Sequence, residues 1–154
     1  MRILKNGLII VLSIMTFNVT AQTEEICGNS KIPSGWIIVS WGGTCLKEGN
    51  KTHNIRKIKK IDHLQVNSIE TICGDSPIPY GWVVVKWGGV CKKIGNQTHH
   101  ERQIKRIDSL PIGSVEEICG DSPIPSGWVL KSWGGVCKKI GNQEHKIRKI
   151  KKIQ

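Results

Sequence analysis

The residues of this chain that could do chemistry recur with a period of 46. Each copy carries two cysteines 18 positions apart, a histidine eight positions after the second cysteine, and a Cys-Gly-Asx-Ser motif. Paired cysteines form disulfides or bind zinc, and histidine and aspartate transfer protons or bind metal ions. Self-similarity at a fixed period indicates a repeat architecture, so each candidate can be judged by comparing its copies.

The cysteines are expected to form one disulfide within each copy. A zinc site expects ligands two to four residues apart, and the wider gap here argues against metal. Six cysteines in an exported chain favour disulfides, and the repeat symmetry selects one of the possible connectivities. A loop of this size is stabilised by about 3 kcal/mol in the chain-entropy model. The expected pairs are Cys27–Cys45, Cys73–Cys91 and Cys119–Cys137, with no metal and no cofactor.

The histidines and acidic residues are weak candidates for catalysis. His53, His99 and His145 recur, but no acid or base partner recurs beside them. Asp75 and Asp121 are replaced by Asn29 in the first copy, which suits a side chain that braces a turn through backbone amides. The chain has no Gly-x-Ser-x-Gly, His-Glu-x-x-His or phosphate-loop motif, so we expect no enzyme and no catalytic residue.

The tryptophans and the basic residues are the stronger functional signal. Six tryptophans accompany one tyrosine and one phenylalanine. Indole rings stack on sugars and nucleobases, and nearby cations would complete a binding strip. We predict ligand contact for the tryptophan before each Gly-Gly and for basic residues that close each copy: Trp41, Trp87, Trp133, Arg56, Lys57, Arg102, Lys105, Arg148 and Lys149.

These residues must be positioned by short strands. The runs 36–41, 82–87 and 128–133 are β-branched and aromatic and are bounded by glycine, which is typical of strands. Their first tryptophans are assigned to the core, and a spacing of five predicts that the second ones lie on the opposite face. The following Gly-Gly predicts a tight turn or a bulge, and the Gly-Asn pairs at 49–50, 95–96 and 141–142 predict turns.

The basic end of each copy is ambiguous. Ile55, Ile58 and Ile61 are spaced by three, which fits neither a helical stripe nor a strand face cleanly. β-branching favours a strand containing a bulge over a basic amphipathic helix. The connectors 62–69 and 108–115 alternate apolar residues and are expected to be extended.

Residues 1–21 are expected to be a cleaved export signal. Arg2 and Lys5 precede an apolar run over 8–17, and Val19-Thr20-Ala21 matches a signal-peptidase site. The run is half as long as the roughly 20 apolar residues of a membrane-spanning helix. The repeats would then occupy 22–69, 70–115 and 116–154, in a secreted protein of the extracellular space or periplasm, with no transmembrane segment after cleavage.

Charge narrows the class of partner. Without Arg2 and Lys5 the chain has 21 basic and 12 acidic residues, and each copy opens acidic and closes basic. A positive exported protein is drawn to anionic surfaces, although the charge also suits simple solubility. An anionic polysaccharide or cell-envelope glycan is the expected partner, ahead of nucleic acid or an anionic membrane surface.

The motif Cys-Gly-x-Ser-x-Ile-Pro-x-Gly-Trp-Val resembles a cassette of small uncharacterised exported proteins of bacteria, over about 20 residues per copy. The resemblance implies a secreted β unit and supplies no activity. The expected fold class is all-β, with three tandem disulfide-tied modules of about 46 residues. The alternative is a single β-trefoil with pseudo-threefold symmetry, a fold in which ricin-type lectins carry a Gln-x-Trp signature that this chain lacks.

Three functions are compatible with these patterns. The first is a non-enzymatic binding protein in which repeated Trp and Lys/Arg surfaces hold an anionic polymer or cell-surface glycan with avidity. The second is a membrane-active, antagonistic cationic protein. The third is a structural protein that assembles with itself, acidic starts against basic ends.

Overall fold

The protein is built from nine β-strands, and its computed structural model describes residues 22–28, 30–48, 51–94, 97–140 and 143–154. Within these residues there is no helix, and each copy of the repeat supplies three strands. The strands are β1 (Thr23–Cys27), β2 (Trp36–Glu48), β3 (Lys51–Lys60), β4 (Ile69–Cys73), β5 (Trp82–Ile94), β6 (Gln97–Arg106), β7 (Val115–Cys119), β8 (Trp128–Ile140) and β9 (Gln143–Lys152).

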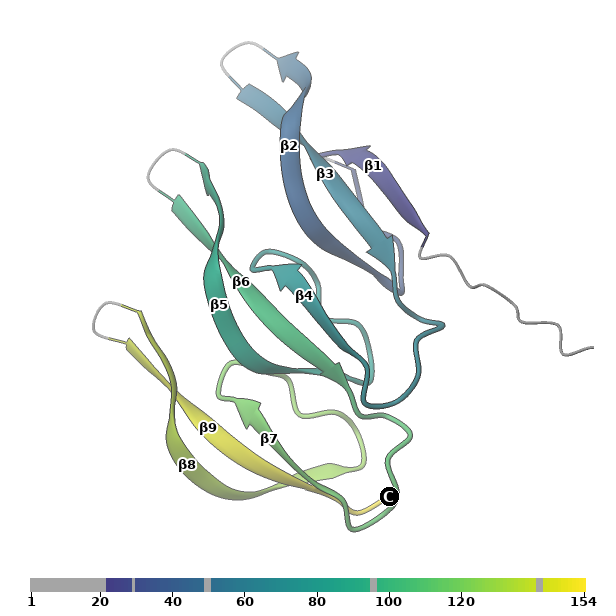
Figure 1. Ribbon diagram of the computed structural model, residues 1–154, viewed down its shortest axis with the longest axis vertical. Coiled ribbons are helices and arrows are strands. Elements are labelled where there is room, and N and C mark those ends of the chain that lie inside the picture. The colour runs from purple at the N-terminus through teal and green to yellow at the C-terminus, as the bar shows by residue number, and fades with distance from the viewer. Residues whose placement is uncertain (1–21, 29, 49–50, 95–96, 141–142) are drawn as a thin grey trace, which may run out of the picture.

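Each module is a separate three-stranded antiparallel sheet. The strand orders are β1-β3-β2, β4-β6-β5 and β7-β9-β8, so the third strand of each module is central. The modules follow one another along the long axis, and their hairpin ends point to the same side (Figure 1). The expected tandem array of β modules is therefore confirmed, and the sheets do not close around a threefold axis as in a trefoil.

One disulfide fastens each sheet, in the expected pairs Cys27–Cys45, Cys73–Cys91 and Cys119–Cys137. In each pair the bridge joins the end of the first strand to the second strand. All cysteines of the chain are bridged. Three such bonds in a small protein indicate an oxidising compartment.

The basic segments are strands, and the isoleucine spacing has a simple reason. Residues three apart on a strand point to opposite faces. Ile58 packs with Trp36 of its own module, whereas Ile61 belongs to the cluster that contains Ile72 of the next module. Both isoleucines are fully buried because the sheet is covered on both faces. No bulge in β3 is required.

Bulges occur in β2 and its equivalents, and they correct the predicted orientation of the tryptophans. The register shifts between Ile38 and Ser40, and again across Gly42-Gly43. Trp36 lies opposite Lys60 and Trp41 lies opposite Arg56, four residues along β3, so both indoles share one face. They also pack in one cluster. The prediction of opposite faces was wrong because the bulge adds one residue to β2, which brings Trp41 back to the face of Trp36.

The loop between the first and second strands is the main packing unit. It crosses its own sheet, and its turn requires glycine because φ is 78° at Gly35 and 80° at Gly81. Ile78 in the second loop packs against Ile37 of the first module and Trp82 of its own. Ile124 in the third loop likewise packs against Val83 and Trp128. Each of these loops is therefore sandwiched between two successive sheets.

Hydrogen bonds also join each sheet to the module that follows it, a contact that we call a seam. The amide of Ile38, beside the bulge, donates to Ser76 Oγ of the next module at 2.8 Å, and the amide of Val84 donates to Ser122 Oγ at 2.9 Å. Both serines are buried. These hydrogen bonds therefore add polar contacts to each seam.

The connectors are turns, not the extended segments that the sequence suggested. Asn67 has φ of 69° and donates its amide to Arg106 O at 2.9 Å, while the Arg106 amide donates to Ser68 O at 3.0 Å. Leu64 packs on the core. The apolar alternation thus reflects anchoring of a turn. The predicted Gly-Asn turns and the export signal lie outside the described residues.

The seam serines give a matched stability test. Replacing Ser76 with Ala leaves the buried Ile38 amide without its acceptor, which should lower the free energy of unfolding by about 1–3 kcal/mol. Ser30, at the same place in the first copy, is exposed and its hydroxyl bonds no described residue, so Ser30→Ala should change it very little. Urea unfolding at low protein concentration, followed by tryptophan fluorescence, measures both. Equal losses would contradict the seam bond.

Candidate functional site

Two of the three predicted ligand-contact tryptophans lie at the seams. Trp41 Nε1 donates to Asp75 Oδ1 of the following module at 3.2 Å, and Trp87 Nε1 donates to Asp121 Oδ1 at 3.2 Å. The Trp133 indole receives no such acceptor from any described residue, and Trp133 is 59% exposed. The acidic residues thus serve a neighbouring indole instead of their own turn, which corrects the turn-brace interpretation. Asn29 itself lies outside the described residues.

The recurring histidines also reach back to the preceding module. The His99 ring lies 6.4 Å from the Trp41 ring, and the His145 ring lies 5.5 Å from the Trp87 ring. The side chain of His53 is outside the described set. Both ring pairs are tilted, with 34° and 36° between the ring planes, and His99 Nδ1 also lies 4.0 Å from Asp75 Oδ1. The described residues contain no group of three His, Cys, Asp or Glu side chains that could hold a metal ion.

The predicted arginines brace the Cys-Gly-Asx-Ser loops. Arg102 Nη2 donates to Gly74 O at 2.5 Å and Ser76 O at 3.1 Å. Arg56 and Arg148 make the equivalent bonds to backbone carbonyls of their own loops. Each guanidinium lies over the tryptophan of its module, at 5.6, 5.6 and 5.9 Å from the ring centres of Trp41, Trp87 and Trp133. Burial lowers the pKa of Arg102, while Asp121 and Asp75 oppose that shift.

The predicted lysines differ from one another. Lys105 Nζ pairs with Glu116 of the next module at 2.8 Å, and Lys149 Nζ pairs with Glu117 at 2.9 Å. Lys57 is exposed and makes no ion pair with any described residue. Of the nine predicted contacts, Lys57 and Trp133 are therefore the most open to solvent. Ligand contact by the set as a whole stays a prediction.

Sequence reasoning missed a row of hollows along the proline loops. Four hollows form two pairs related by the repeat, one pair between successive loops and one pair beside the connectors. Tyr80 lines all four and is 78% exposed. We call this surface, centred on Tyr80, the loop row. The sequence did contain a signal for this surface, because Tyr80 stands where the other two copies have Ser34 and Ser126.

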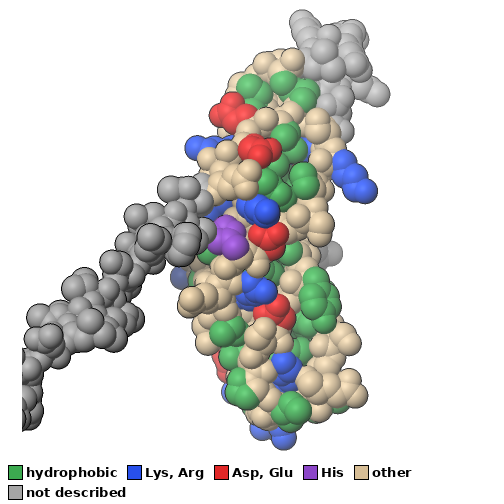
Figure 2. Space-filling model, turned by 90° about the vertical axis from the view of Figure 1, so that its right-hand side faces the viewer, with side chains coloured by type: hydrophobic (Ala, Val, Ile, Leu, Met, Phe, Trp, Pro, Cys, Tyr) green, Lys and Arg blue, Asp and Glu red, His purple; other side chains and the backbone are tan. Residues whose placement is uncertain are grey.

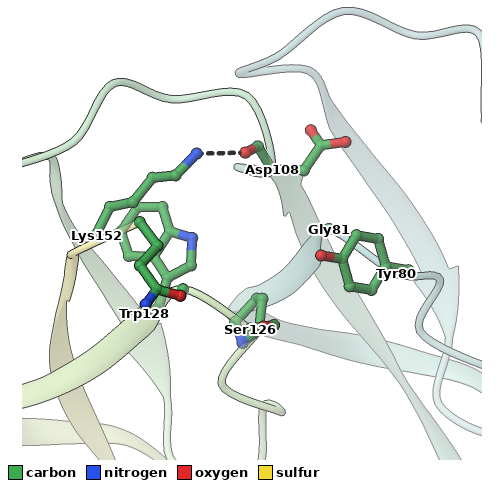
Figure 3. A pocket seen from close by; sticks show the side chains of 9 residues that line it. Tyr80, Gly81, Asp108, Ser126, Trp128 and Lys152 are labelled. Atoms are coloured by element: carbon green, nitrogen blue, oxygen red, sulfur yellow. Dashed lines mark hydrogen bonds between the residues drawn. The ribbon is translucent and has the colours of Figure 1, made fainter.

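One hollow of the loop row is drawn in Figure 3. Tyr80 and Asp108 of the second module face Ser126, Trp128 and Lys152 of the third across an open space. Lys152 Nζ donates to the backbone oxygen of Asp108 at 2.6 Å, which fixes the two modules relative to each other. Hydroxyl, carboxylate and ammonium groups thus line this hollow together with the rings of Tyr80 and Trp128.

An ion pair sets the electrostatics of this surface. Arg106 donates from Nε and Nη2 to the two carboxylate oxygens of Asp108, each at 3.0 Å. The hydrogen bonds to Arg106 lower the pKa of Asp108, and the same bonds raise the pKa of Arg106. Arg106 also donates to Asp62 O at 2.8 Å. The loop row therefore carries an ionised carboxylate clamped by a fixed cation.

The size of the hollows limits what they can hold. Their volumes are 170 to 270 Å³, below the roughly 300–1,000 Å³ of pockets that enclose a small molecule. A shallow periodic row instead suits a ligand that lies across several units. On the face that Figure 2 shows, acidic and basic side chains are interspersed along the long axis, so that face offers no strip of one sign.

The Arg106–Asp108 pair predicts a pH dependence. Because the folded pKa of Asp108 is lowered, its stabilising contribution is fully present above the unfolded value near 3.9 and is lost as the pH falls through the folded value. In Asp108→Asn, the free energy of unfolding should therefore fall less steeply as the pH drops through the acid range, which urea unfolding at several pH values measures. We call this part of the stability profile the acid limb. The matched control is Asp62→Asn, at a carboxylate whose ion pair with Lys60 is longer, at 3.8 Å. Indistinguishable acid limbs for wild type and Asp108→Asn would disprove the assignment.

Comparison with known proteins returned no match: no family model, curated protein or solved structure matches the chain. Among the described residues, no helix is long and apolar enough to cross a membrane. What the protein binds must therefore be inferred from the groups that its surface presents.

Proposed function

We propose that this is an exported, non-enzymatic repeat protein that binds an extended anionic glycan across the loop row, with Tyr80 as the central stacking ring. The observation that carries the proposal is that one exposed aromatic side chain lines all four hollows. Export is supported by the three disulfides and by the signal-like residues 1–21.

The lining groups have the chemistry that a sugar polymer requires. An exposed aromatic face packs against a sugar ring, and side-chain hydroxyl and carboxylate groups such as those of Ser126 and Asp108 bond its hydroxyls. Proline rings add rigid apolar walls at low entropic cost. The hollows repeat, so a polymer gains several weak contacts at once.

Charge selects an acidic polymer over a neutral one. The exported part has 21 basic and 12 acidic residues, and Lys31, on the first proline loop, makes no ion pair within the described chain. Lysines at the margin of a neutral contact surface raise the association rate of a polyanion and are screened by salt. We therefore expect affinity for an acidic glycan to fall as the salt concentration rises.

The decisive variant is Tyr80→Ser, because serine occupies this position in the other two copies and the backbone already accepts it. Loss of an exposed stacking ring should weaken binding of polygalacturonate about tenfold, on the order of 1.4 kcal/mol. Titration calorimetry at low and high salt measures the affinity, and Tyr80→Phe, which keeps the ring, serves as the control. The same titration with dextran, an uncharged polysaccharide, tests whether the surface binds a neutral glycan instead.

Two outcomes would decide against this surface. If Tyr80→Ser binds as tightly as wild type while Trp133→Ala loses binding, the contact runs through the exposed tryptophan and its neighbouring cations. If wild type binds neither polygalacturonate nor dextran, the glycan proposal is wrong.

A further inference from the structure

The outer face of the last sheet is bare where the other two sheets are covered. Val129 is 40% exposed, whereas Ile37 and Val83, its equivalents in the first two modules, are fully buried. On the opposite face of the same edge strand, Leu130 is 41% exposed against fully buried Ile38 and Val84. Ile153 is 48% exposed against fully buried Ile61 and Ile107. The third module thus presents an apolar surface of the kind that is buried at each seam.

Inside the chain, a proline loop fills this surface. Ile78 and Ile124 are the apolar residues that the two covered sheets receive from the following loop. The seam adds a serine on a strand amide, an aspartate on an indole, and an ion pair: Lys59–Glu70 at 2.7 Å or Lys105–Glu116 at 2.8 Å. After the third module, no described residue supplies any of these to Leu130, Trp133 or Lys151.

The opposite end of the molecule carries the complementary set. The first loop has Ile32 at the position of Ile78. Ser30 is exposed, whereas Ser76 and Ser122 are 4% and 3% exposed. Glu24 is exposed at the position where Glu70 and Glu116 accept the seam lysine. The first module therefore presents the loop side of a seam and the third module presents the sheet side.

We propose that the partner of the bare face is a second copy of this chain, whose first loop docks on the third sheet in the geometry of an internal seam. Glu24 of one copy then pairs with Lys151 of the other, Ser30 Oγ accepts the Leu130 amide, and Ile32 covers Val129. The contact is head-to-tail, so each added copy leaves both kinds of end open and the product is an open filament. This inference is independent of glycan binding.

One residue weakens this joint relative to the internal seams. Lys131 stands where Val39 and Val85 pack against the seam clusters. Its aliphatic stem can lie on the apolar face with the ammonium in solvent, at a cost in side-chain freedom. The association is therefore reversible and depends on protein concentration. A polar residue on the outer face of the last unit also keeps a repeat array soluble.

A charge swap tests the joint with the exported, oxidised protein in low salt. Wild type should form oligomers whose size grows with concentration in analytical ultracentrifugation. Glu24→Lys and Lys151→Glu should each weaken association about tenfold or more, because they place like charges together, and the double variant should restore it. Lys86→Glu is the control, because Lys86 is exposed in the middle module where the other copies have serine.

A second variant keeps the test sharp if wild-type association is weak. Lys131→Val restores the residue of the internal seams and should tighten association about tenfold. A monomer at every concentration, for wild type and Lys131→Val alike, would overturn the proposal. So would oligomers that Lys151→Glu weakens but Glu24→Lys does not, since that pattern indicates a symmetric contact between two bare sheets.

Discussion

The structure depends on one constraint: a three-stranded sheet this small has two faces to cover and cannot cover both alone. Each sheet shields one face with its own proline loop and leaves the other to the loop of the next module. The fully buried Ile37 and Val83 show that this burial is complete where a following module exists. A disulfide reduces the freedom of each unfolded unit, but cohesion between units comes from the sandwiched loops and from the serine hydroxyls that accept strand amides.

Comparing the copies predicted most of a single module. The disulfide pairs, the strands, the proline loop and the buried first tryptophans all follow from residue type and spacing within one period. The relation between modules did not follow. The bonds from Trp41 to Asp75 and from Ile38 to Ser76 span 34 and 38 residues, and no local pattern encodes them. The bulge beside Ile38 also changed the face of Trp41, because one inserted residue shifts the phase of every later side chain.

The candidate site shows why counting charges misleads in a repeat protein. Basic residues were singled out because they recur, yet recurrence reflected a recurring structural task for the arginines. Arg56, Arg102 and Arg148 hold backbone carbonyls, which would recur in any copy that needs the same loop. Tyr80 does not recur, and for that reason it passed unnoticed as a candidate. In near-duplicate modules, a departure from the shared frame carries more information about binding than the frame itself.

The seams have a direction, because Glu, Asp, Ser and His residues of each module act on the module before it. A module therefore carries the groups that cover its predecessor, and it needs the same groups from its successor. Duplication or deletion of one 46-residue unit in the gene would leave every remaining seam chemically intact. Chain length in this architecture can change by whole units in a single genetic event.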